Sequence, residues 1–232
     1  MPVIDSRKNK IKGSVQTLLG RCGFALVRKP VRWLGRKRII NLYEYNVTDF
    51  VRYSSLELAT YEVNSKNLIG SVAELGVYKG DFAVKLNEAF PDRKLYLFDT
   101  FEGFDQRDKC LEEKEAYSNA DEDFSDCNVD LVLGRMKYPA NCVVKKGYFP
   151  DTVEGMNDSF VFVSLDADLY KPTYDGLSFF WPRLVPGGYI FVHDFNNAGY
   201  GGVRAAVSRF CAENKNNFFP LSDAAGTAVF CK

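Results

Sequence analysis

Residues 69–99 have the sequence IGSVAELGVYKGDFAVKLNEAFPDRKLYLFD, and this stretch decides the fold class. Apolar runs at residues 69–75 and 94–98 are typical of strands, whereas residues 82–89 carry apolar side chains at helical intervals. The glycine-containing turn GVYKGD joins the first strand to the helix. A strand, a helix and a second strand at this spacing form a βαβ unit, so we expect the two strands to be parallel neighbours.

The same alternation continues along the rest of the chain. After one or two helices over residues 41–65, we expect strands at 142–146, 160–165 and 189–192 and helices at 127–138, 150–156, 172–184 and 203–213. Continuously apolar strands such as FVFVSL and YIFV are typical of a sheet that is covered on both faces. Segments 218–221 and 227–231 predict a closing antiparallel hairpin. The sequence therefore predicts one α/β domain over residues 41–232, with a mostly parallel sheet and helices on both faces.

Composition excludes several classes of protein. The 232 residues are 46% hydrophobic, which is ample for a core and excludes wholesale disorder. No apolar run approaches the roughly 18–20 residues of a membrane-spanning helix. The N-terminal residues show no signal-peptide pattern and the six cysteines form no CxxC pair, so we expect a cytoplasmic protein with reduced thiols. The single histidine, His193, excludes sites that need two imidazoles.

The charge is unevenly distributed. Residues 1–38 hold eleven lysines and arginines and one acid, Asp5, so the rest of the chain is acidic. We interpret residues 1–40 as a basic N-terminal helical extension. It could lie on an anionic membrane surface at the inner face of the membrane or bind an acidic partner; alternatively it is solvated and packs on its own domain or on a second subunit of a homo-oligomer. Nucleic-acid binding is not expected, because the acidic main domain would repel phosphates.

Carboxylates gather where the predicted parallel strands end. Open parallel sheets bind their ligands at the carboxyl ends of the strands. The residues at the five ends are Glu74, Asp99, Gly147 after Lys146, the pair Asp166 and Asp168, and the pair His193 and Asp194. Such a concentration of acids is unfavourable unless a cation or hydrogen-bond donors satisfy it.

The turn from Glu74 to Gly80 indicates a nucleotide-like ligand without matching GxGxxG. Gly76 and Gly80 would let the backbone approach a ligand closely. The acid before them would repel a pyrophosphate but suits hydroxyls, an amine or a sulfonium, and Asp99 is placed to bind ribose hydroxyls. A nicotinamide-dependent dehydrogenase is therefore disfavoured. The simpler alternative is that the glycines serve only a tight turn.

Three acids, Asp166, Asp168 and Asp194, suit Mg²⁺, which prefers oxygen ligands. Bound Mg²⁺ would lower the pKa of a coordinated substrate hydroxyl, and a nearby carboxylate could accept its proton. The alternative is that Asp166 and Asp168 cap the helix that follows them. His193 could equally be a structural histidine.

Between residues 72 and 210 the chain carries six stretches in this order: VAELGVYKGDFA, LYLFDTFEGF, KKGYFPDTV, LDADLYKPTYDGL, LVPGGYIFVHDF and GGVRAAVSRF. Together they resemble the class I S-adenosylmethionine-dependent O-methyltransferases of the macrocin and mycinamicin type, which methylate sugar hydroxyls. The resemblance implies a Rossmann-like class I methyltransferase fold. It also implies S-adenosylmethionine as cofactor.

The resemblance implies cofactor-binding roles for residues of three strand ends. The glycine turn would hold the methionine part of S-adenosylmethionine, and the acid one strand later would bind its ribose. The residues concerned are Glu74, Gly76, Tyr78 and Gly80 in the turn, Asp99 on the ribose, and Gly147.

For the chemistry, the resemblance implies that Asp166 binds Mg²⁺ together with His193 and Asp194. Asp168 stands where a general base has been proposed. Relatives carry two acids where this chain has His193-Asp194, so His193 could ligate the metal, act as a base or only pack. The distantly similar catechol O-methyltransferases place a lysine where Leu169 stands, so a lysine base is absent here.

The predicted function is transfer of a methyl group from S-adenosylmethionine to a hydroxyl of a sugar, assisted by Mg²⁺. The acceptor would belong to a glycan, a glycolipid precursor or a glycosylated small molecule. The charged segment 100–125 lacks a hydrophobic period and is expected to be a surface flap, placed to serve as a lid. The alternatives are a phenolic or other small-molecule hydroxyl acceptor, or a membrane-associated binding protein without catalysis.

Overall fold

The structure, a computed structural model, describes residues 32–33, 36–37 and 49–232. The chain divides into two units, Met1–Arg38 and Ile39–Lys232. In the first unit, β1 (Arg32–Trp33) and β2 (Arg36–Lys37) form a short antiparallel pair where the sequence predicts a helical extension. The rest of that extension, and the predicted helical residues 41–48, lie outside the described residues.

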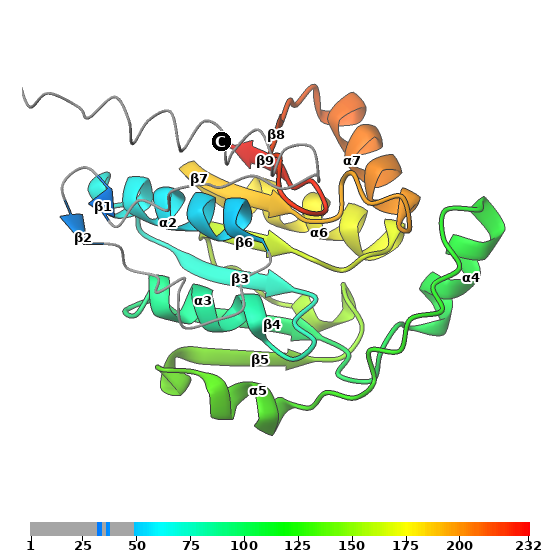
Figure 1. The fold of residues 1–232 in the computed structure, drawn as a ribbon, viewed down its shortest axis with the longest axis horizontal. Helices are drawn as coiled ribbons and strands as arrows, with labels where there is room; N and C mark the ends of the chain where they lie inside the picture. Colours follow the sequence, from blue (N-terminus) through cyan, green and yellow to red (C-terminus); the bar gives the residue numbers. More distant parts are fainter. Residues whose placement is uncertain (1–31, 34–35, 38–48) are drawn as a thin grey trace, which may run out of the picture. The chain divides into compact units, whose positions relative to one another are not determined.

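The second unit contains a seven-stranded sheet in the order β5-β4-β3-β6-β7-β9-β8 (Figure 1). Its strands are β3 (Ser71–Leu75), β4 (Leu95–Asp99), β5 (Cys142–Lys146), β6 (Phe160–Leu165), β7 (Leu184–Val192), β8 (Phe219–Pro220) and β9 (Ala228–Cys231). The first five in the order are parallel, and β9 pairs antiparallel with both β7 and β8. The predicted fold class is confirmed, including the closing hairpin.

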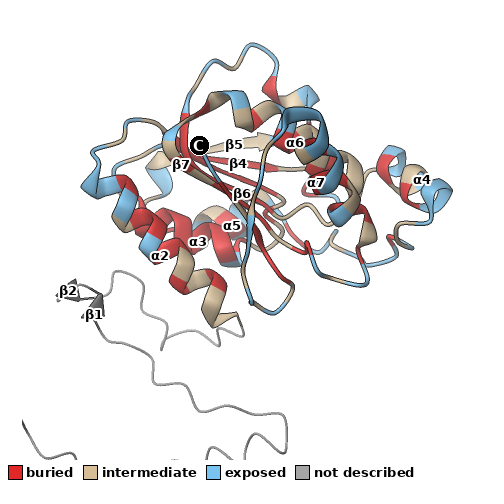
Figure 2. Ribbon diagram, turned by 90° about the horizontal axis from the view of Figure 1, so that it is seen from above, coloured by how far each residue is buried: buried red, intermediate tan, exposed pale blue. Residues whose placement is uncertain are grey.

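Helices cover both faces of this sheet, as predicted (Figure 2). One face is covered by α2 (Phe50–Ser65), α3 (Asp81–Ala89) and α5 (Val129–Arg135), and the other by α6 (Tyr170–Arg183) and α7 (Gly201–Asn214). Short 3₁₀ turns precede and follow β5, at Pro139–Asn141 and Asp151–Val153. Within the described ranges, no helix is both long and apolar enough to cross a bilayer.

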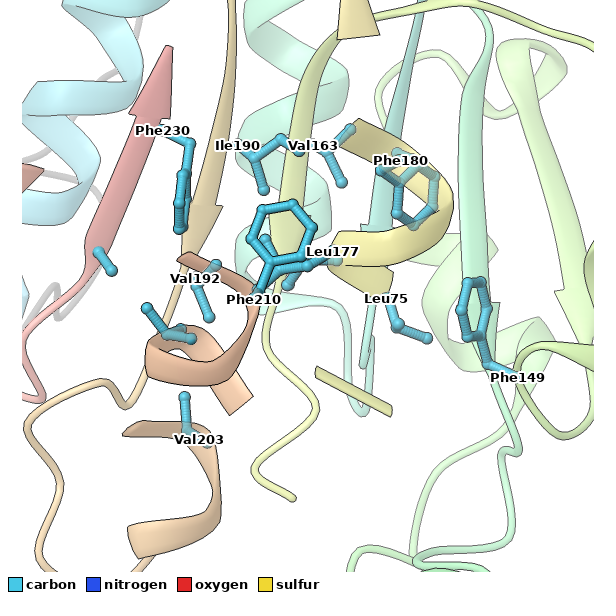
Figure 3. Packing of buried hydrophobic residues seen from close by; sticks show 14 of the residues in the cluster. Leu75, Phe149, Val163, Leu177, Phe180, Ile190, Val192, Val203, Phe210 and Phe230 are labelled. Atoms are coloured by element: carbon cyan, nitrogen blue, oxygen red, sulfur yellow. The ribbon is translucent and has the colours of Figure 1, made fainter. Parts of the chain in front are cut away.

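Each face of the sheet carries its own apolar core, because successive strand residues point to opposite faces. In β4, Leu95 and Leu97 belong to the core beneath α2 and α3. Tyr96 and Phe98 belong to the core beneath α6 and α7. Figure 3 shows the second core, in which aromatic and aliphatic side chains such as Phe180 interdigitate between the sheet and the helices. These cores hold the strand ends in fixed positions.

Three segments of the second unit differ from the sequence-based expectation. Residues 150–156, predicted to be a helix, form only the 3₁₀ turn at Asp151–Val153. Strand β7 begins at Leu184 and runs through Gly187 and Gly188, whereas we predicted a strand only from residue 189, and its pairing with β6 shifts register in that region. Segment 100–125 was predicted to be an irregular flap but contains α4 (Gln106–Glu115), which projects from the domain in Figure 1. Helix α4 buries acids rather than an apolar stripe, so hydrophobic periodicity could not reveal it.

Candidate active site

The carboxyl ends of the parallel strands surround a cavity of about 330 Å³. That volume lies in the range of small-molecule sites. Among its lining residues are most of those predicted from sequence: Glu74, Gly76, Tyr78, Asp99, Gly147, Asp166, Asp168, His193 and Asp194. Gly80 does not line it. The tertiary structure thus brings residues from five strand ends to one place, as expected for an open parallel sheet.

Glycines shape the floor of this cavity by allowing close backbone approach. Gly76 has φ +86°, and a Cβ there would lie 1.9 Å from the backbone oxygen of Asp166. Any side chain at this position would therefore separate the ends of β3 and β6. Gly80 has φ +81° and is the N-cap of α3, where a Cβ would lie 3.1 Å from Val132 of α5. Gly80 therefore serves the turn and its packing against α5.

Asp99 organises the loop that follows β3. Its Oδ2 accepts hydrogen bonds from the backbone N–H groups of Val77 (2.6 Å) and Tyr78 (2.9 Å). Its Oδ1 accepts from the N–H of Phe101 at 2.7 Å. The carboxylate thus holds the glycine turn against the end of β4, a structural task that sequence reasoning had not assigned to it.

Glu74 is the most deeply buried acid of the cavity, and its Oε2 has no hydrogen-bond partner. Burial, together with the nearby charge of Asp166, raises the pKa of Glu74 well above its ordinary value, although Arg52 opposes this. A buried carboxyl oxygen without a donor is costly. A ligand that brings a donor or a positive charge into the cavity would remove that cost.

A second group of polar residues lies where β6 and β7 end. Nδ1 of His193 lies 2.8 Å from Oδ1 of Asp166 and 2.7 Å from Oδ2 of Asp194. One ligand atom from each of the three residues lies within 4.8 Å of the others. Burial lowers the pKa of His193, but the carboxylate of Asp166 outweighs it, and the pKa rises to about 11. As an imidazolium His193 bridges the two acids, and as a neutral imidazole it offers Nδ1 as a ligand.

Three residues that the sequence reasoning missed surround this group. Arg52 of α2 is buried and donates from Nη2 to Oδ2 of Asp166 at 2.9 Å and to Oγ of Ser164 at 3.2 Å. Asn197 donates to Oδ1 of Asp194 at 2.8 Å. Asp49, the N-cap of α2, lies with Oδ2 3.8 Å from Nε2 of His193. All three are far in sequence from their partners or lack a local pattern, so no motif could have identified them.

Asp168 lies in the same group and has an unusual backbone. Its φ is +59°, a left-handed conformation that is uncommon outside glycine, although aspartate is among the residues that tolerate it. Burial and the charges of Asp166 and Asp194 raise its pKa well above the ordinary value. The carboxyl group is therefore a stronger proton acceptor than an exposed aspartate.

The alternative that Asp166 and Asp168 cap the following helix is wrong. Helix α6 has Leu169 as its N-cap, with no capping side chain of its own. The first N–H of the helix, that of Tyr170, instead donates to Oε1 of Glu112 at 2.7 Å. Since Glu112 belongs to α4, the cap comes from the segment that we predicted to be a flap, and the two aspartates are left to the cavity.

Known proteins are similar to this chain over most of its length. A model of the macrocin O-methyltransferase (TylF) family matches residues 28–232. The chain belongs to this family. It is therefore an S-adenosylmethionine-dependent O-methyltransferase.

Two relatives from Streptomyces are similar in sequence. The 8-demethyl-8-(2,3-dimethoxy-alpha-L-rhamnosyl)-tetracenomycin-C 4′-O-methyltransferase of Streptomyces olivaceus is 25% identical over 192 residues, which cover 77% of this chain and 72% of the relative. The demethyldecarbamoylnovobiocin O-methyltransferase of Streptomyces niveus is 24% identical over 186 residues, which cover 72% of this chain and 68% of the relative.

Two solved structures share the fold. The O-methyltransferase NovP matches with a TM-score of 0.63 and 18% identity over 78% of this chain and 79% of that chain. The calicheamicin methyltransferase CalS11 matches with the same TM-score and identity over 78% of each chain. At this identity the likeness concerns the fold, which is that of the class I O-methyltransferases.

The residues present fit the methyl donor that this family uses. S-adenosylmethionine carries an ammonium and a sulfonium group, and Glu74, whose buried Oε2 has no hydrogen-bond partner, lines the cavity that would receive them. The close approach at Gly76 leaves the backbone bare at the cavity floor. Both features suit a positively charged ligand that lies against the glycine turn.

The residues also fit a divalent cation. Asp166 and Asp194 each keep one carboxylate oxygen toward the interior of the group, while the other oxygen accepts a hydrogen bond from Arg52 or Asn197. Carboxylates that are held in this way by outer partners are typical of metal ligands. The prediction that Asp166, His193 and Asp194 bind a metal therefore agrees with the geometry and stays a prediction.

Proposed function

We propose that this enzyme transfers the methyl group of S-adenosylmethionine to a hydroxyl of a sugar unit in a glycan or a glycosylated small molecule. We further propose that a divalent cation, Mg²⁺ by the expectation from sequence, assists at Asp166, His193 and Asp194. The observation that carries the proposal is the half-buried Asp168, which lines the same cavity as these three residues and the glycine turn.

A sugar hydroxyl needs help because it is a weak acid and a poor nucleophile near neutral pH. Asp168 supplies a carboxyl group whose pKa is raised, so it accepts a proton more readily than an exposed aspartate does. The bound cation would lower the pKa of the hydroxyl. The name of the Streptomyces olivaceus relative, a 4′-O-methyltransferase of a rhamnosyl compound, supports a sugar acceptor.

The other residues of the cavity would position the methyl donor. S-adenosylmethionine supplies an activated methyl group, so alignment and proton removal are the tasks left to the protein. Glu74 would neutralise its positive groups at the glycine turn, and Asp99 fixes that turn through Val77 and Tyr78. Gly147 follows β5 on the cavity wall and would let the backbone approach the donor.

Three aromatic side chains form part of the cavity wall. Phe124 stands edge-on to Tyr78 at 5.0 Å between ring centroids and to Phe104 at 5.1 Å. All three rings line the cavity. Phe104 and Phe124 belong to segment 100–125, so this segment would act as the predicted lid and help to exclude water during methyl transfer.

A matched pair of acceptors tests the proposal. The full chain is incubated with S-adenosylmethionine, Mg²⁺ and either 4-methylumbelliferyl α-L-rhamnoside, which has only sugar hydroxyls, or free 4-methylumbelliferone, which has only a phenol. Mass spectrometry reads the gain of one CH₂ unit, and fragmentation locates it. We expect methylation of the rhamnoside on its sugar. Methylation of the phenol alone would contradict the proposal and favour a phenolic acceptor.

A further inference from the structure

The orientation of His193 requires a positive centre in front of its Nδ1 atom. Nδ1 lies within 2.8 Å of one oxygen each from Asp166 and Asp194. A ring nitrogen lone pair and two carboxylate oxygens repel one another at these distances, so either a ring proton or a cation must lie among them. His193 is the only histidine of the chain.

The other polar atoms of Asp166, His193 and Asp194 lie close to three further residues, Arg52, Asp49 and Asn197. Asp166 uses its second oxygen to accept from the buried Arg52, and Asp194 uses its own to accept from Asn197. Each carboxylate therefore presents a single oxygen to the centre. Outer partners of this kind orient metal ligands and are less needed for a simple hydrogen-bonded bridge.

The second nitrogen of His193 completes this pattern. Nε2 lies 3.8 Å from Oδ2 of Asp49, a buried oxygen without a hydrogen-bond partner. Histidines that bind metals usually direct their other ring nitrogen toward a carboxylate. The ring is therefore oriented with Nδ1 toward the two acids and Nε2 toward a third.

The distances from Nδ1 of His193 to the two acids also suit one ion. Nδ1 lies 2.7 and 2.8 Å from the two carboxylate oxygens, and the edge of an octahedron whose ligands stand about 2.1 Å from a small divalent cation is about 3 Å. All three ligand atoms lie within 4.8 Å of one another, so these residues form a group that could hold one metal ion.

We infer that this site prefers Mn²⁺, or another first-row transition ion, over Mg²⁺, because His193 is its third protein ligand. The inference rests on the proposed function in that it concerns the same metal site. Mg²⁺ favours oxygen ligands, whereas imidazole nitrogen is a ligand of the first-row transition ions, a series in which Mn²⁺ binds most weakly. We therefore expect Mg²⁺ to bind only weakly to one imidazole and two carboxylates.

Electron paramagnetic resonance on the tag-free full chain tests the inference without any turnover. Mn²⁺ is titrated into the protein, its free signal is followed, and Mg²⁺ is added as competitor. We expect Mn²⁺ to bind about tenfold or more tightly than Mg²⁺. Electron spin echo envelope modulation of the bound Mn²⁺ should show coupling to an imidazole nitrogen. Because the chain has one histidine, that coupling can come only from His193.

Two substitutions provide the matched comparison. His193→Asp makes all three protein ligands oxygens, so the preference for Mn²⁺ should fall about tenfold and the nitrogen coupling should vanish. Since a third acid beside Asp166 and Asp194 could impair folding, His193→Gln serves as a second variant with a neutral oxygen ligand, and the same loss is expected. Asp130→Asn, on the exposed surface of α5, is the control and should change neither quantity.

Three results would overturn the inference: bound Mn²⁺ without nitrogen coupling, equal affinity for Mg²⁺, or no binding of Mn²⁺ to the wild-type chain. The last would mean that the ring proton, not a cation, bridges the two acids. Failure of the proposed function has a different signature, because the rhamnoside would then stay unmethylated with Mg²⁺ and with Mn²⁺ while the nitrogen coupling is still observed.

Discussion

Asp168 combines an uncommon backbone conformation with a carboxyl group whose pKa is raised by its surroundings. Asp168, three residues beyond β6, lines the cavity and has a left-handed φ of +59°, and Asp194, two residues beyond β7, has nearly the same φ of +58°. Non-glycine residues in this conformation are strained and are concentrated at functional sites. The sequence identified both aspartates as strand-end acids. Only the structure shows that both adopt this conformation and that the charge of Asp194 helps to raise the pKa of Asp168.

Substitution of Asp168 tests its role as proton acceptor. Asp168→Asn keeps the shape of the side chain but cannot take up a proton, so kcat for methyl transfer to the rhamnoside should fall by about 10²–10⁴. The KM for S-adenosylmethionine should change little, because the residue is not assigned to donor binding. The measurement is steady-state kinetics, with Asp130→Asn as control. An unchanged kcat would show that another group removes the proton.

The raised pKa of Asp108 should make the stability of the folded protein depend on pH. Burial raises its pKa to about 6, although a hydrogen bond from the hydroxyl of Tyr148 (2.9 Å) opposes the shift. Since the folded pKa exceeds the ordinary value of 3.8, ionisation disfavours folding, and this penalty develops as the pH rises from about 4 to about 6. Asp108→Asn should therefore raise the melting temperature relative to wild type at pH 8 but not at pH 4. Equal shifts at both pH values would contradict the assignment.

At the scale of elements, α4 and α6 are joined by one buried acid. Glu112 accepts from the N–H of Tyr170 at 2.7 Å and from the hydroxyl of Ser118 at 2.6 Å. The stacked rings of Tyr117 and Tyr170, 5.1 Å apart, continue the contact. The charged segment 100–125 is therefore fastened to the helix that follows Asp166 and Asp168. Its composition indicated only a solvated surface.

Removal of this cap should loosen the domain measurably. Glu112→Ala leaves the first N–H of α6 without its acceptor and removes a charged hydrogen bond, which lowers the free energy of unfolding by about 2–3 kcal/mol. Glu112→Gln keeps an acceptor oxygen and should cost less. Urea unfolding followed by circular dichroism measures both variants. If the two variants lost the same stability, the contact with Tyr170 would not be the cause.

At the scale of the whole molecule, ligand binding should stabilise the fold because the cavity is assembled from five strand ends. S-adenosylhomocysteine at 100 times its Kd should add about 2.7 kcal/mol to the free energy of unfolding. Asp99→Ala frees the N–H groups of Val77 and Tyr78, so its affinity for the ligand should fall at least about tenfold through the displaced turn. Calorimetric titration gives the affinity and thermal unfolding the stabilisation. Unchanged affinity in the variant would remove Asp99 from the donor site.

The amino-acid sequence by itself determined the βαβ order, the parallel sheet with its antiparallel end, and the strand-end acids. These features depend on local apolar patterns and on residue types next to strands, which are contiguous in the chain. It also carried the family motifs, and the match over residues 28–232 confirmed the family.

Only the tertiary structure decided which residues surround those acids. Arg52 and Asp166 are 114 positions apart, and Glu112 and Tyr170 are 58 positions apart, so no local pattern connects them. Their pairing arises because the start of α2 brings Arg52 to Asp166 at the end of β6, and because α4 contacts α6. The same packing directs the ring of His193 between Asp166 and Asp194. Side-chain direction and outer partners depend on long-range packing, and these decide what the strand-end acids can bind.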